Sequence, residues 1–144
     1  MLKRSLVSGT DLFQSEELET ISSVDHDHEL IGEKVRSAFY NSYLAGPALV
    51  NDIWRTIEDE SSRASIENLM RSSADTSVEA MLNKIDHRVM LLWGLEDRIT
   101  PPGITFHFHD FLQNSEIRFI EKCGHLPMVE EPERFIKHLV SFFD

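Results

Sequence analysis

The 144-residue sequence has few cysteines, glycines and prolines, and it lacks a long apolar run. Its one cysteine, Cys123, excludes an intramolecular disulfide and any zinc or iron–sulfur site made of several cysteines. Six glycines and five prolines are too few for a collagen-like or linker-like chain. The longest apolar stretches, such as residues 89–93, are too short for a membrane span or a signal peptide. We therefore expect a cytoplasmic protein.

Basic residues are also scarce. The sequence has 14 lysines and arginines but 25 aspartates and glutamates, which gives a net charge of −11. A surface this acidic repels a phosphate backbone, so we expect no nucleic-acid partner. The same charge argues against docking on anionic membranes, so we expect no membrane partner either. The hydrophobic fraction of 41% and the charged fraction of 27% are typical of one globular domain.

The sequence changes character near residue 86, and the part before it is predicted to be helical. Val35, Phe39 and Tyr43 fall at i, i+4 and i+8. This spacing predicts a helix that begins at residue 33 and that the Gly-Pro pair at 46–47 stops. Further apolar stripes predict helices that begin near residue 48, that surround residues 66–70, and that run from Thr76 to residue 85.

The part after residue 86 is predicted to alternate strand and helix. Residues 89–93 form a continuous apolar run closed by Gly94, which is typical of a strand buried on both faces of a parallel sheet. A helix around residues 104–112, a strand over 117–120 and a helix from Pro132 are predicted to follow. The order strand, helix, strand, helix implies parallel pairing with right-handed crossovers. The predicted fold class is α/β, with a helical insertion before residue 86.

Residue types that carry acid–base chemistry follow both predicted strands. Asp97 comes shortly after the first strand, and His125 comes shortly after the second, 28 positions later. Because the carboxyl ends of parallel strands meet at one edge of a sheet, we expect these two side chains to lie side by side. An aspartate held against one imidazole nitrogen leaves the other free to act as a general base. The alternative is a helix-capping aspartate and a partly buried loop histidine.

These residues lie in two motifs, Trp93-Gly94-Leu95-Glu96-Asp97-Arg98 and Cys123-Gly124-His125-Leu126-Pro127. Both motifs resemble the acid and histidine motifs of the α/β-hydrolase superfamily. Together with Ala38-Phe39-Tyr40, they are similar to meta-cleavage-product (carbon–carbon bond) hydrolases and related esterases. The resemblance implies that Asp97 is the acid and His125 the base of a catalytic triad. It implies no cofactor and no metal, because the family mechanism uses side chains and water only.

The resemblance also divides the chain into three parts. Residues 1–11 would contain the sheet strand that follows the helix of the nucleophile. Residues 12–85 would form a helical cap over the substrate, and residues 86–144 the C-terminal segment of the core. The expected fold is therefore the C-terminal part of an α/β hydrolase, a helical cap followed by strand, helix, strand and helix with parallel strands.

The nucleophile of the family is not found in this sequence. The serine belongs to a Gly-x-Ser-x-Gly turn, and none of the six glycines has a serine two positions away. The oxyanion-hole segment is missing as well, and each of its donors contributes about 3 kcal/mol to transition-state stabilisation. We therefore expect a half-hydrolase that is inactive alone. Its expected partner is a missing N-terminal half that completes the site, or a second copy of the chain in a homo-oligomer. The alternatives are a non-catalytic remnant that binds a small ligand or a protein, and a subunit that pairs with a full-length hydrolase.

Four residues are candidates to line the pocket for a small apolar ester or ketone-type substrate: Tyr40, Tyr43, Trp54 and Leu126. For the three aromatic residues, packing between cap and core is the alternative interpretation.

Other reactive residue types have simpler interpretations. Ser8 lies on a strand that does not carry the nucleophile in this family, and Cys123 is interpreted as a small packed thiol. The stretch 25–28 reads Asp-His-Asp-His, but consecutive side chains diverge, so we interpret it as a solvated loop rather than a metal site. Glu130 and Glu131 are interpreted as a solvated turn and the start of a helix.

Overall fold

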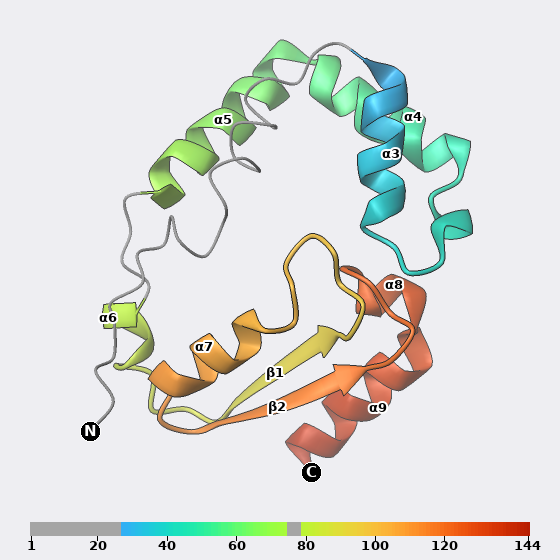
Figure 1. The fold of residues 1–144 in the computed structure, drawn as a ribbon. Helices are drawn as coiled ribbons and strands as arrows, with labels where there is room; N and C mark the ends of the chain where they lie inside the picture. The colour runs from blue at the N-terminus through green and yellow to red at the C-terminus, as the bar shows by residue number, and fades with distance from the viewer. Residues whose placement is uncertain (1–26, 75–78) are drawn as a thin grey trace.

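The computed structural model describes residues 27–74 and 79–144 (Figure 1). The strand predicted near Leu6 and the helix start predicted at Thr76 lie outside the described residues. The element order is α3 (His28–Ser37), η1 (Ser42–Leu44), α4 (Pro47–Glu58), α5 (Glu60–Ala74), α6 (Glu79–Leu82), β1 (Val89–Gly94), α7 (Ile104–Phe111), β2 (Ser115–Ile120), α8 (Pro127–Glu130) and α9 (Pro132–Phe143). None of the helices in these two ranges is long and apolar enough to cross a membrane.

Local capping chemistry determines where the helices before residue 86 begin. The carboxylate of Asp27 accepts hydrogen bonds from the backbone N–H groups of the first turn of α3. Pro47 occupies the first turn of α4, where its missing N–H has no cost. Asp59 separates α4 from α5, because its carboxylate accepts from the Ser62 N–H at 2.9 Å and from the Ser61 hydroxyl. These bonds lower the pKa of Asp59 to about 2.

The first helix predicted from the sequence is wrong at its C-terminal end, because α3 stops at Ser37 and not at the Gly-Pro pair. Beyond Ser37, the carbonyl of Ala38 accepts a hydrogen bond from the N–H of His125 at 2.7 Å. The N–H of Tyr40 donates to the carboxylate of Glu130, also at 2.7 Å. These bonds to the C-terminal part of the chain replace the helical ones, so the apolar residues beyond Ser37 do not continue the helical face.

The part after residue 86 confirms the predicted alternation of strand and helix. β1 and β2 pair in parallel, with a register that runs from Val89 opposite Ser115 to Gly94 opposite Ile120. Both strands therefore end at the same edge. Helix α7 contacts both strands, and α9 contacts β2 (Figure 1).

Burial of the strands differs from the continuous burial that the apolar run predicted. In the described ranges the sheet consists of these two strands, whose residues are half-buried except for the buried Gly94 and Ile120. The apolar stripe of α9 is also partly open, with Ile136, Val140 and Phe143 more than half exposed. Large apolar side chains thus remain at the surface of the described part of the chain.

Two glycines allow backbone segments to touch at the carboxyl edge of the sheet. A Cβ atom added to Gly94 would overlap the carbonyl oxygen of Gly124 and would lie 2.5 Å from that of Cys123. A Cβ atom added to Gly124 would lie 2.5 Å from the carbonyl oxygen of Ala38. The segment between α3 and α4 is consequently held against this edge, and these helices lie beyond the tips of both strands (Figure 1).

We predict that Gly94→Ala destabilises the fold by about 2–3 kcal/mol, because backbone atoms cannot move aside as a flexible side chain does. The matched control is Gly103→Ala. No atom lies within 4 Å of a Cβ atom added there, and the φ of −57° suits alanine, so its effect is about 0–1 kcal/mol of stabilisation. Urea unfolding followed by circular dichroism measures both. Equal midpoints for the two variants would contradict the close packing at Gly94.

Candidate active site

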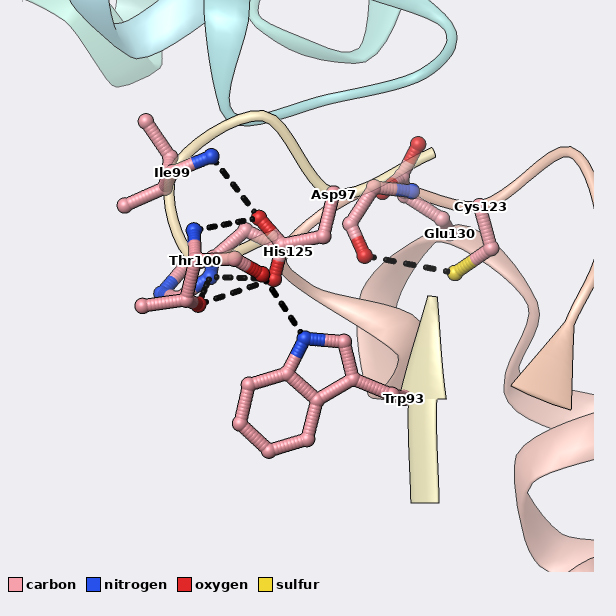
Figure 2. Close-up of polar contacts among 8 residues, drawn as sticks. Trp93, Asp97, Ile99, Thr100, Cys123, His125 and Glu130 are labelled. Carbon is pink, nitrogen blue, oxygen red and sulfur yellow. Dashed lines mark hydrogen bonds and ion pairs between the residues drawn. The ribbon is translucent and has the colours of Figure 1, made fainter. Parts of the chain in front are cut away.

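Asp97 lies in a tight turn directly after β1, and its own side chain builds that turn. One carboxylate oxygen, Oδ1, accepts from the N–H groups of Ile99 and Thr100, at 2.9 and 3.0 Å. The indole N–H of Trp93 donates to the carbonyl of Thr100 at 2.9 Å and ties the turn to the strand. The side chain of Asp97 is 3% exposed, so its carboxylate is held in one orientation (Figure 2).

His125 follows β2 and faces Asp97, as the spacing predicted. Its Nδ1 lies 2.9 Å from Oδ2 of Asp97. The hydroxyl of Thr100 lies 3.0 Å from the same oxygen and 3.1 Å from Nδ1, so the three groups form one cluster (Figure 2). The backbone N–H of His125 donates to the carbonyl of Ala38, as described above, so both the backbone and the ring of His125 are held in place.

This geometry leaves the second imidazole nitrogen available for chemistry. A carboxylate is an acceptor only, so it favours the tautomer of His125 with the proton on Nδ1. Nε2 then carries a lone pair, and no residue within the described ranges hydrogen-bonds to it. The histidine side chain is 38% exposed, so Nε2 is accessible to a reacting group. An imidazole held in this way can accept a proton at Nε2, and the carboxylate stabilises the imidazolium that forms.

Two further carboxylates shape the turn that precedes His125. Glu96 accepts from the N–H of Cys123 at 3.0 Å, and its own N–H donates to the Cys123 carbonyl at 3.0 Å. Glu130 accepts from the N–H of Gly124 at 2.7 Å. Lys122 has a positive φ of 56°, the left-handed conformation that reverses the chain before this turn. The backbone before His125 is therefore bound on two sides.

The interpretation of Glu130 as a solvated turn residue is wrong, because its carboxylate is half-buried and accepts several backbone N–H groups. Sequence reasoning also missed Thr100 and Glu96. For Thr100, a usable signal was its position three residues after Asp97, where a carboxylate reaches backbone N–H groups. For Glu130, six residues beyond Gly124, no local pattern indicates the contact, since its partners come from two separate segments.

The four pocket candidates occupy different environments. Tyr40 is half exposed and adjoins the active-site edge through its backbone bond to Glu130, whereas the side chain of Tyr43 is 94% exposed. Trp54 on α4 packs edge-on against His28, with 5.3 Å between the ring centroids. Leu126 directly follows His125 and is half-buried.

The acidic and histidine-rich stretch at 25–28 is described only in its second half. Asp27 caps α3, and His28 Nε2 lies 2.8 Å from the amide oxygen of Asn51. Asp25 and His26 lie outside the described residues. Within 27–74 and 79–144, no group of three or more histidine, cysteine or acidic residues is arranged to hold a metal ion.

Cys123 is fully buried, and its thiol lies 3.7 Å from the carbonyl oxygen of Gly124. Burial raises the pKa of the thiol to about 12, and the negative charges of Glu130 and Glu131 add to this effect. The thiolate is the nucleophilic form of cysteine, so a thiol with this pKa is unreactive at neutral pH.

We predict that iodoacetamide alkylates Cys123 in the folded chain at pH 8 at least about 100-fold more slowly than in urea, because the unfolded thiol has an ordinary pKa near 8.5. Intact-mass spectrometry over time measures the two rates. Rapid alkylation of the folded chain would contradict a packed thiol and would make Cys123 a candidate nucleophile.

Known proteins similar to this chain are hydrolases. Over 125 residues it is 26% identical to YugF, an uncharacterized hydrolase of Bacillus subtilis, and the match covers 87% of this chain and 41% of the relative. Among solved structures, it resembles a meta-cleavage product hydrolase from Pseudomonas fluorescens, with a TM-score of 0.75 and 15% identity over 96% of this chain and 52% of the other. It also resembles an esterase from Exiguobacterium antarcticum, with a TM-score of 0.70 and 20% identity over 88% of this chain and 47% of the other.

No protein-family model matches the chain. The chain spans about half the length of the proteins it resembles. Its parallel strands and flanking helices correspond to the C-terminal part of the α/β-hydrolase fold. The homologues and structural neighbours of this chain are thus α/β hydrolases, including meta-cleavage product hydrolases and esterases.

Proposed function

We propose that this chain provides the acid and the base of a serine-dependent hydrolase that cleaves an ester or a carbon–carbon bond. Asp97 orients His125, and His125 acts as the general base through Nε2. The observation that carries the proposal is the 2.9 Å contact between Nδ1 and Oδ2 of the buried carboxylate, beside an accessible Nε2. An aspartate–histidine pair of this kind activates a hydroxyl nucleophile.

In the proposed reaction, Nε2 of His125 takes the proton from a serine hydroxyl as its oxygen attacks the carbonyl carbon of the substrate. Asp97 stays ionised and stabilises the imidazolium that forms. The imidazolium then returns the proton to the leaving group, and the acyl-serine is hydrolysed by water in a second step of the same kind. His125 is thus the group through which each proton passes.

The serine and the oxyanion hole come, in this proposal, from polypeptide outside these 144 residues, and the chain alone is inactive. Three observations support this part. The sequence contains no Gly-x-Ser-x-Gly turn, and the chain matches only 41–52% of the length of its relatives. The exposed apolar side chains of α9 are also typical of a surface that further structure covers.

For the substrate, we propose a small apolar ester or ketone-type molecule under a cap formed by residues 12–85. The support is the position of α3 and α4, which lie beyond the carboxyl edge of the sheet where Asp97 and His125 meet (Figure 1). The names of the structural neighbours, a meta-cleavage product hydrolase and an esterase, agree with both bond types.

The test compares the 144-residue chain with the polypeptide that also contains the sequence encoded directly upstream of the Met1 codon. We predict that the joined polypeptide contains the serine turn and hydrolyses p-nitrophenyl acetate, whereas the 144 residues alone do not. His125→Ala in the joined polypeptide lowers kcat/KM by roughly 10⁴-fold or more, because the general base is lost.

The matched control is His87→Ala, since the side chain of His87 is 89% exposed and lies before β1, away from Asp97. This variant keeps the activity of the wild type. Full activity of His125→Ala, or an upstream sequence without a serine turn in any frame, would overturn the proposal and favour a role in ligand or partner binding.

A further inference from the structure

Glu130 connects two segments that are far apart in the sequence. Its Oε1 accepts from the N–H of Gly124 at 2.7 Å, in the turn that carries His125. Its Oε2 accepts from the N–H of Tyr40 at 2.7 Å and from that of Asn41 at 3.3 Å, in the segment between α3 and η1. One carboxylate therefore binds both segments, with one oxygen for each.

The two segments also touch directly, so the carboxylate sits at an existing junction. The N–H of His125 donates to the carbonyl of Ala38 at 2.7 Å. Gly124 has no side chain, and a Cβ atom there would lie 2.5 Å from that carbonyl oxygen and 2.8 Å from the backbone nitrogen of Tyr40. Segment 38–41 and the backbone of the turn that carries His125 are therefore in direct contact.

The chemistry of these bonds makes Glu130 hard to replace. Hydrogen bonds from backbone N–H groups to an ionised carboxylate are about twice as strong as those between neutral groups. Without the carboxylate, the N–H groups of Gly124 and Tyr40 would lose their acceptor. Helix α8 holds Glu130 in place, because its N–H donates to the carbonyl of Leu126 at 2.9 Å.

We propose that Glu130 is a positioning residue that fixes the distance between segment 38–41, where the helical part begins to cover the site, and His125. The helical cover and the base then move as one unit. This inference rests on the proposed function only where it assigns a catalytic role to His125, since the junction itself lies within the described chain.

The first experiment uses the 144-residue chain and does not depend on activity. Glu130→Gln has the same size but only one acceptor oxygen, and its amide N–H₂ opposes one set of backbone N–H groups. We predict that hydrogen exchange of the Tyr40 or Gly124 amide, followed by NMR, accelerates at least about tenfold in this variant. Exchange of the amides in β1 stays as in the wild type.

The matched control is Glu131→Gln, which removes the same charge one residue away. The Glu131 carboxylate pairs with Arg134 at 3.8 Å, and this variant leaves the exchange of both amides unchanged. Equal exchange in the two variants would overturn the positioning role. If Glu130→Gln does not fold, Glu130→Asp, which keeps the charge but is one methylene shorter, gives the same comparison.

The second experiment uses the joined polypeptide. We predict that Glu130→Gln lowers kcat about 10-fold to 100-fold with a smaller change in KM, while Glu131→Gln changes neither. If exchange accelerates in Glu130→Gln but the wild-type joined polypeptide shows no His125-dependent hydrolysis, the proposed function is refuted and the role of Glu130 at the junction stands. Hydrolysis that Glu130→Gln leaves unchanged would refute the positioning role and leave the proposed function standing.

Discussion

The parallel pairing of β1 with β2 is the constraint on which the site depends. Because Gly94 lies opposite Ile120, both strands end at the same edge, and the turns that follow them start side by side. Asp97 is three residues beyond the first strand end, and His125 is five residues beyond the second. A shift of register by two residues would move one of these turns by about 7 Å and would separate the carboxylate from the imidazole.

Three carboxylates stabilise the backbone around His125 by accepting hydrogen bonds. Asp97, Glu96 and Glu130 all accept backbone N–H groups. Asp97 binds its own turn, Glu96 and Glu130 bind the turn before His125, and Glu130 also binds the segment after α3. Turns have few internal hydrogen bonds of their own, so such acceptors replace the missing ones. Some of the acidic residues therefore stabilise turns at this site, in addition to the effect of the net negative charge on the choice of binding partners. The imidazole of His125 is placed by this framework and lies against Asp97.

The sequence predicted the α/β alternation and the meeting of Asp97 with His125, because both follow from strand order. The apolar run at 89–93 and the closing Gly94 marked the end of the first strand, and the second strand was predicted one helix later, over 117–120. The C-terminal end of α3 was not predictable from periodicity. The backbone groups directly after this helix are bound by His125 and Glu130, which come much later in the sequence. The role of Glu130 was missed for the same reason, since its partners lie on two separate segments.

The most direct test of this account is the protonation of the His125 ring, measured by ¹⁵N NMR of the imidazole nitrogens at a pH where the ring is neutral. We predict a proton on Nδ1 and a free lone pair on Nε2, because Nδ1 lies 2.9 Å from the Asp97 carboxylate. We also predict that Asp97→Asn changes this tautomer, since an amide can donate where the carboxylate only accepts. A proton on Nε2 in the wild type, or a tautomer that ignores the substitution, would contradict an acid–base pair prepared within this chain.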